Sequence, residues 1–361
     1  MKPSKKAIFT LILLGICVVI KLYSIEAARV EAGYSTEYFP AFGALLRRIF
    51  GKLPFSIGDI LYASLICLAV YSLSRLGLRL ARRQSSLNPD RLKNKFYTVT
   101  ISLATLYIIF NLFWGINYNR KGIAWQLGLP TLKYNTAELL EMNKLLLIKV
   151  NHSKAALLAG NIGYPSTPDL FKRVEKVYTE AATQYPILAY PHSSLKTSLW
   201  GWLGNYAGFT GYYNPFTGEA QVNTNVPKFL QPFTSCHEVA HQLGYAKEME
   251  ANFVGYLAAT HSRDTLFHYS VYLDLFTYAN RNLFITDSVA AKMLRNNLSA
   301  PVKEDLKEWM LFNKRHRSFL EPIVRWGYGI FLRNNEQPQG MLSYDEVTGF
   351  LIAYYKKYGR I

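Results

Sequence analysis

Two histidines and a glutamate form the group in this sequence that is best suited to chemistry. Residues 234–252 read TSCHEVAHQLGYAKEMEAN, which places His237, Glu238 and His241 in an HExxH pattern. On an α-helix, residues four apart project from the same face, so His237 and His241 could share one metal ion. Zn²⁺ accepts imidazole nitrogens with little geometric demand of its own. Glu238 is placed to accept a proton from a water molecule that the metal activates. The pattern predicts a hydrolytic site with one zinc ion per chain.

Two glutamates compete to be the third ligand of this metal. Glu248 and Glu250 both follow the second histidine closely, and on one helix they point about 200° apart, so only one can face the metal. Asn252 lies one turn after Glu248, on the same face. A polar residue there could hold a ligating histidine through its other ring nitrogen. We therefore prefer Glu248, with Glu250 as the alternative.

The helix that carries the pattern needs a start and an end. Thr234 or Ser235 is suited to cap its beginning, and Gly244 is suited to end it. The HExxH pattern alone is short and arises by chance in on the order of one chain in a hundred of this size. These boundary signals favour a true helix at the expected place.

The two motifs together, HEVAH and then EMEAN at 248–252, resemble those of the zincin metallopeptidases, particularly the gluzincins. In that family the third ligand is a glutamate, commonly followed four residues later by an aspartate. The resemblance implies a zincin-like domain, zinc, and a peptide or protein substrate. This chain differs in having Asn252 where aspartate is usual and in the short interval between its motifs. Gly244 is similar in position to a metzincin glycine, but Lys247 stands where the third metzincin histidine would be.

The chain also resembles, over nearly its whole length, an uncharacterised family of bacterial membrane proteins known only as domain of unknown function 3810. The resemblance is carried by three N-terminal apolar segments, WGINY at 114–118, GYYNPFT at 211–217 and the histidine–glutamate helix. It implies a peptidase-like domain in the bacterial inner membrane and identifies no substrate.

The segment before the helix is rich in glycine, and residues 219–225 alternate like a short strand. In zincins an edge strand ahead of the helix binds extended peptide by strand addition, which needs only backbone groups. The resemblance implies this role for Glu219, Ala220, Gln221, Val222 and Asn223. An ordinary glycine-rich loop and strand is the alternative. His192, Tyr212, Tyr213 and Tyr256 are conceivable donors to an oxyanion.

Three apolar stretches precede these motifs, at about 7–25, 55–73 and 96–117. A bilayer core needs about 20 apolar residues per helix. A signal peptide followed by two buried helices is the alternative, but a signal peptide would account for only the first stretch. We expect a membrane domain at 1–118 with three transmembrane helices in the lipid bilayer, followed by the zincin-like domain at 119–361.

Basic residues predict how these helices are oriented. They crowd the N-terminus and the connection between the second and third stretches, whereas the first connection is nearly balanced in charge. Lysine and arginine stay on the cytoplasmic side. The residues concerned are Lys2, Lys5, Lys6, Arg75, Arg79, Arg82, Arg83, Arg91, Lys93 and Lys95. We expect a cytoplasmic N-terminus and, after three spans, an extracytoplasmic C-terminal domain.

Composition excludes some classes of protein. Half of the residues are hydrophobic and 15% are aromatic, which is too apolar for a disordered chain. The net charge of +17 would favour nucleic-acid binding in a soluble protein, but its densest cluster lies between apolar stretches, so we expect no nucleic-acid partner. The three cysteines form no disulfide framework.

Together these patterns predict an α+β protein: three transmembrane helices and then a mostly helical domain with a short sheet. The predicted function is zinc-dependent hydrolysis of peptide bonds at the membrane. A non-catalytic membrane receptor or scaffold that retains a zincin-like domain is the alternative. A structural zinc site prefers four protein ligands and excludes water, and only three ligands are apparent here.

Overall fold

The computed structural model describes residues 4–81, 89–130, 132–338, 340 and 346–361. Three helices in this part of the chain are long and apolar enough to cross a membrane: α1 (Lys5–Ile25), α4 (Ile57–Ala81) and α5 (Pro89–Phe113). At most 22% of each apolar window is buried inside the protein. Their exposed apolar side chains therefore require another nonpolar environment, as a lipid bilayer provides.

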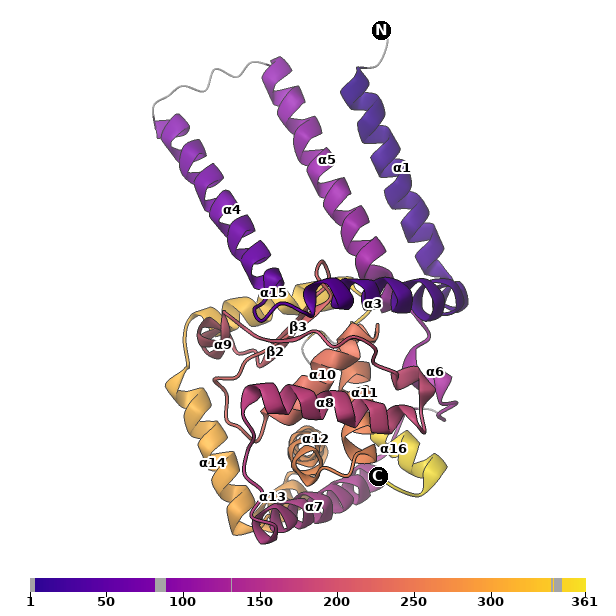
Figure 1. Cartoon of the computed structure of the whole chain (residues 1–361), viewed down its shortest axis with the longest axis vertical. Helices are drawn as coiled ribbons and strands as arrows, with labels where there is room; N and C mark the ends of the chain where they lie inside the picture. The colour runs from indigo at the N-terminus through magenta and orange to yellow at the C-terminus, as the bar shows by residue number, and fades with distance from the viewer. Residues whose placement is uncertain (1–3, 82–88, 131, 339, 341–345) are drawn as a thin grey trace.

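The three candidate spans stand side by side on a globular part made of the rest of the chain (Figure 1). The start of α1, the end of α4 and the start of α5 lie away from the globular part. The third span ends at Phe113, earlier than the expected 117, because the chain turns there into the 3₁₀-helix η2 (Gly115–Asn119).

A short helical layer between α1 and α4 was not expected from the sequence. It consists of α2 (Ala27–Arg29), the π-helix η1 (Val30–Tyr38) and α3 (Phe39–Phe50), and it lies at the foot of the spans in Figure 1. Arg47 on α3 donates hydrogen bonds to the carbonyls of Pro191, His192 and Gln242 in the globular part. Arg47, from the part of the chain before residue 118, therefore packs on the later part.

The globular part is mostly helical. Its helices are α6 (Gly122–Gln126), α7 (Thr136–Ala159), α8 (Thr167–Ala182), η3 (Pro186–Leu188), α9 (Gly201–Ala207), α10 (Gln231–Gln242), α11 (Glu248–His261), α12 (Thr265–Thr286), α13 (Ser288–Asn296), α14 (Ala300–Arg315), α15 (Leu320–Asn334) and α16 (Val347–Tyr358). Every residue of α10 is buried, and α10 packs against α8, α11, α12 and the sheet. The helix of the HExxH pattern is thus the centre of the core.

α10 begins earlier than expected. It starts at Gln231 with a proline in its first turn, so Thr234 and Ser235 lie inside the helix and do not cap it. The hydroxyl of Ser235 instead donates to the carbonyl of Gln231 at 2.7 Å. The C-terminal prediction is confirmed: α10 ends at Gln242, and Gly244 has φ +89°, a conformation that glycine adopts without strain.

The sheet has three strands: β1 (Leu195–Thr197), β2 (Gly211–Asn214) and β3 (Glu219–Val222). Their order is β1-β3-β2, with β3 parallel to β1 and antiparallel to β2. The strand expected near 219–225 therefore exists, but its expected place at an edge is wrong. β3 is paired on both sides, so its backbone has no open edge on which an extended peptide could add a strand.

Side chains of β3 also bind the start of α4. The carboxylate of Glu219 accepts the N–H groups of Ile57 and Gly58, at 3.1 and 2.6 Å, at the start of α4. A carboxylate is favourable there because a helix N-terminus presents unpaired N–H groups and a positive dipole end. The amide of Gln221 lies 2.9 Å from the hydroxyl of Ser56, just before the helix. β3 thus anchors the second candidate span to the sheet.

Candidate metal centre

The predicted site residues come from two consecutive helices that pack closely. α10 carries His237, Glu238 and His241, and α11 begins at Glu248 after a tight turn at Gly244. The helices approach closely at Gly255, where an added Cβ would lie 3.3 Å from the backbone nitrogen of His237. A larger residue there would push α11 and its glutamate away from the histidines.

His237, His241 and Glu248 form a buried cluster whose candidate ligand atoms all lie within 4.8 Å of one another. Oε2 of Glu248 lies 3.2 Å from Nε2 of His237 and 3.5 Å from Nε2 of His241. The side chains of the histidines are 11% and 9% exposed, and that of Glu248 is 2% exposed. The cluster combines the nitrogen and oxygen donors that zinc takes in proteins.

The other ring nitrogen of each histidine is held by an oxygen. Nδ1 of His241 lies 2.8 Å from the backbone carbonyl of Tyr245, and Nδ1 of His237 lies 2.7 Å from Oδ1 of Asn252. A carbonyl oxygen only accepts, so Nδ1 must carry the proton in each pair. In the neutral rings the lone pair is then on Nε2, the atom that faces Glu248. Asn252 occupies the supporting position that the sequence indicated.

The two competing glutamates are placed differently. Glu248 belongs to the cluster, and its Oε1 accepts a hydrogen bond from the hydroxyl of Tyr328 at 2.5 Å. The buried carboxylate of Glu250 lies instead against the turn into α6, where a Cβ on Gly122 would come within 1.7 Å of its Oε1. Among the described residues, Glu250 is not part of the cluster. The helix geometry thus separates the two side chains.

Glu238 lies beside the edge strand of the sheet. A Cβ added to Gly211, the first residue of β2, would fall 2.4 Å from Oε1 of Glu238, so the carboxylate rests against bare backbone. Its Oε2 is buried and has no hydrogen-bond partner in the described structure. Burial raises the pKa of Glu238 to about 7, against the opposing charges of His237 and His241.

The charges in the cluster depend on one another. Burial alone would lower the pKa of His237, but the hydrogen bond and charge of Glu248 raise it to about 9. Burial alone would raise the pKa of Glu248, but the two histidines hold it well below its ordinary value. An ionised carboxylate this deeply buried needs a positive charge beside it, and a protonated histidine supplies that charge here.

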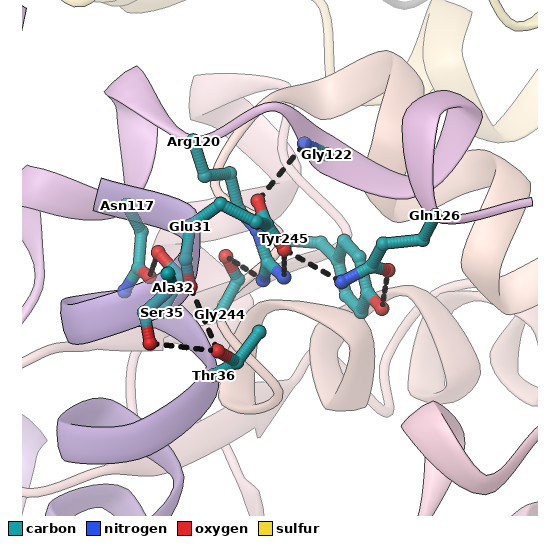
Figure 2. A network of polar contacts seen from close by, with 10 residues as sticks. All are labelled: Glu31, Ala32, Ser35, Thr36, Asn117, Arg120, Gly122, Gln126, Gly244 and Tyr245. Carbon is teal, nitrogen blue, oxygen red and sulfur yellow. Dashed lines mark hydrogen bonds and ion pairs between the residues drawn. The ribbon is translucent and has the colours of Figure 1, made fainter. Parts of the chain in front are cut away.

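A buried polar network supports the end of α10 (Figure 2). Arg120 forms an ion pair with Glu31 of η1 at 2.7 Å and donates to the carbonyl of Gly244 at 3.1 Å. Its guanidinium lies 4.6 Å from the ring centroid of Tyr245, whose carbonyl holds His241. Gln126 links the hydroxyl of Tyr245 back to Glu31, at 2.8 and 2.7 Å. The segment after the first span is thereby coupled to the second histidine.

The conceivable oxyanion donors make the following contacts. Tyr256 is buried in the aromatic core against Phe253. The hydroxyl of Tyr212 donates to Asp59 at 2.5 Å. Tyr213 packs its ring 4.5 Å from that of Trp114. His192 lies in a loop with φ +59°. None of these contacts involves the cluster itself.

Sequence reasoning missed three residues at the site: Tyr328, Trp114 and Gly211. Tyr328 lies 80 residues from its partner Glu248 and belongs to no motif. Trp114 belongs to the WGINY segment, and its ring centroid lies 6.0 Å from that of His241. The only available signal was the density of the WGINY and GYYNPFT segments in aromatic and glycine residues, which does not indicate what they contact.

Comparison with known proteins gives a family but no activity. A family model described as "Protein of unknown function (DUF3810)" matches residues 34–352, which include two of the candidate spans and the whole metal cluster. No curated protein and no solved structure matches the chain. The match covers most of the sequence, so this chain belongs to the DUF3810 family of proteins of unknown function.

Proposed function

We propose that this protein is a membrane-anchored, zinc-dependent metallopeptidase of the zincin type. The observation that carries the proposal is the distance from Oε2 of Glu248 to Nε2 of each histidine. Two ligands about 2.1 Å from a tetrahedral zinc ion lie about 3.4 Å apart. Oε2 of Glu248 lies 3.2 and 3.5 Å from the two Nε2 atoms. His237, His241 and Glu248 would hold the ion and leave its fourth position for water or substrate.

The chain's own residues have distinct parts in this proposal. Zinc at these ligands would supply a Lewis acid and water that ionises near neutral pH. Glu238 accepts the proton from that water and passes it to the leaving amine nitrogen, as a general base and then a general acid. Asn252 and the carbonyl of Tyr245 fix the two imidazole rings, and Tyr328 orients Glu248.

Catalysis fits Glu238 better than a receptor or scaffold does. A buried carboxylate oxygen without a partner is costly and has no use in a purely structural zinc site. Such a site would also have a fourth protein ligand, and the cluster among the described residues has three members. A scaffold would tolerate loss of Glu238, whereas a hydrolase would not.

Peptide binding by strand addition is supported at β2 in place of β3. β2 is an outer strand of the sheet, and its first residue, Gly211, touches the carboxylate of Glu238. An extended peptide along this edge would pass beside the base and the metal ligands. Backbone pairing there would explain acceptance of peptide without fixing its sequence.

We further propose a bacterial inner-membrane location with the domain outside the cytoplasm. Lys5 and Lys6, and Arg91 and Lys93 near the start of α5, lie at the ends of the spans away from the globular part. The positive-inside rule would keep these ends in the cytoplasm. A reporter enzyme that is active only outside the cytoplasm, fused after Ile361, should be active, and a cytoplasmic reporter at that position should be the inactive one. The opposite pattern would reverse the orientation.

The metal proposal is tested by zinc content in the purified full-length protein. We expect about one zinc per chain, lost in His241→Ala and Glu248→Ala and retained in Glu250→Ala. Glu238→Gln should keep its zinc but lose cleavage of a mixed peptide library, followed by mass spectrometry. Folded wild-type protein that takes up no zinc would overturn the proposal. Zinc-loaded protein whose Glu238→Gln variant cleaves as well as wild type would remove the assigned base.

A further inference from the structure

Helix α15 presents an apolar surface that the described part of the chain leaves exposed. Of its fifteen residues only Gly329 and Leu332 are buried. Ile323 and Trp326 are 58% and 68% exposed, and Phe319, just before the helix, is 77% exposed. Large apolar side chains gathered on one exposed helix mark a surface that meets another nonpolar phase or partner.

Both ends of α15 are tied to the candidate spans. Near its C-terminus, the ring centroid of Phe331 lies 6.2 Å from that of Phe110 on α5. Just beyond the helix, Glu336 lies 3.8 Å from Lys21 on α1. α15 therefore meets two spans at their ends nearest the globular part.

The N-terminal end of α15 reaches the remaining span, α4, through α9. The hydroxyl of Ser318 donates to the carbonyl of Tyr206 on α9 at 2.7 Å. Trp200, which precedes α9, donates from its indole nitrogen to the carbonyl of Asp59 on α4 at 3.4 Å. α15 thus lies across the ends of all three candidate spans that are nearest the globular part (Figure 1).

Two further helices present apolar side chains at the same level. On α3, Leu45 and Ile49 are 52% and 53% exposed, and Phe42 packs 4.7 Å from Phe113 at the end of α5. On α9, Trp202 is 67% exposed. We call α3, α9 and α15 the interfacial layer.

We propose that the interfacial layer lies in the membrane surface, with α15 as a helix parallel to the bilayer whose apolar side chains enter the headgroup and acyl region. The lipid bilayer covers this apolar surface, because the surface adjoins the ends of the spans nearest the globular part. Helices with an apolar face that includes tryptophan are suited to this interfacial position. The globular part then rests on the membrane and is not held away from it by a linker.

This position has a consequence for the metal centre, which rests on the proposed function. Tyr328 of α15 binds Glu248, and Trp114, the first residue after α5, packs against His241. A single side chain, that of Tyr328, therefore links the metal cluster to the layer that meets the bilayer. The substrate class that fits is a peptide held at the membrane surface, namely the segment flanking a membrane-spanning helix or a lipid anchor.

Tryptophan quenching tests the bilayer contact without any activity. The full-length protein is placed in nanodiscs of phosphatidylcholine with plain or brominated acyl chains, and the Trp326 signal is taken as the difference between wild type and Trp326→Phe. We expect that signal to fall by about half or more in brominated lipid. The Trp309→Phe difference is the control, because Trp309 on α14 packs against the core and should be unaffected. Equal, weak quenching at both positions would overturn the proposal.

Cleavage tests the substrate class. One peptide sequence, found in the library screen, is offered free or attached to a lipid anchor in the same nanodiscs. We expect a kcat/KM about 10-fold or more higher for the anchored peptide, and we expect Ile323→Glu with Trp326→Glu to reduce that advantage while cleavage of the free peptide is retained. Equal cleavage of both forms would overturn the substrate class and leave the peptidase proposal standing. If the library screen yields no cleaved peptide, the peptidase proposal fails, and the quenching result still decides the bilayer contact.

Discussion

The hydroxyl of Tyr328 donates a 2.5 Å hydrogen bond to Oε1 of Glu248, although the two residues lie 80 positions apart. The bond joins a helix of the interfacial layer to the carboxylate of the candidate metal centre. It leaves Oε2, the other oxygen of Glu248, beside the two imidazoles. The geometry assigns Tyr328 a positioning role, because it touches a ligand and not the metal position itself.

Removing that hydroxyl should weaken zinc binding. We expect Tyr328→Phe to raise the zinc Kd by about 10-fold, the lower end of the range for losing a partner of a ligating group. Competition with a fluorescent zinc chelator measures the Kd. Tyr358→Phe is a matched control, because Tyr358 is 38% exposed near the end of α16. Equal Kd values for Tyr328→Phe and wild type would show that the hydrogen bond from Tyr328 to Glu248 does not contribute to zinc binding.

Asn252 should matter for metal affinity through its contact with Nδ1 of His237. Asn252→Leu removes the acceptor, and we expect the zinc Kd to rise by about 10–100-fold. Asn252→Asp restores an acceptor with more negative charge, so it should bind zinc at least as tightly as wild type. The pair separates the loss of a hydrogen bond from a general packing defect. Weak binding in both variants would argue for packing alone.

Gly211 should control the position of the candidate base. A Cβ there would lie 2.4 Å from Oε1 of Glu238, so Gly211→Ala must displace the carboxylate. We expect the zinc content to be unchanged and kcat for peptide cleavage to fall by about 10–100-fold, since a shift of about 1 Å at a catalytic group has effects of this size. Gly163→Ala is the control, because an added Cβ there meets nothing within 4 Å. A fully active Gly211→Ala variant would place the base elsewhere.

The ion pair between Glu31 and Arg120 should stabilise the junction between η1 and the metal domain. Both side chains are at most 4% exposed, and removing one partner of a buried pair typically costs about 3–5 kcal/mol in free energy of unfolding. We expect Glu31→Gln and Arg120→Met each to lower the melting temperature in detergent. The double variant should lose less than the sum of the two, because it leaves no unpaired charge. Additive losses would mean that the pair is not coupled.

The same pair should make stability depend on pH. Burial alone would raise the pKa of Glu31, but Arg120 and the hydrogen bonds from Gly122 and Gln126 hold it below its ordinary value of 4.5. A carboxyl whose pKa is lowered by folding contributes stability above its unfolded pKa, and the contribution is lost as the pH falls through its folded pKa. The difference in melting temperature between wild type and Glu31→Gln should therefore be full at neutral pH and shrink below about pH 4.5. A difference that is constant across that range would contradict this assignment.

The sequence by itself determined the features that depend on short-range patterns. Spacing of four on a helix brought His237 and His241 to one face, and glycine at 244 ended that helix, because both follow from backbone geometry within a few residues. The three apolar stretches predicted the three candidate spans for a similar reason: length and hydropathy are local properties. The fold class, mostly helical with a small sheet, followed from the same local patterns.

Only the tertiary structure decided what is built from distant parts of the chain. The order of the strands placed β3 between β1 and β2, because pairing depends on which segments meet in space and not on alternation within one segment. The π-helix that presents Glu31 to Arg120 has no sequence pattern of its own. Glu31 can be buried there because it pairs with Arg120, which follows α4 and α5 in the sequence. The position of Tyr328 against Glu248 was likewise set by how α15 packs beneath the spans, a long-range contact that no local motif encodes.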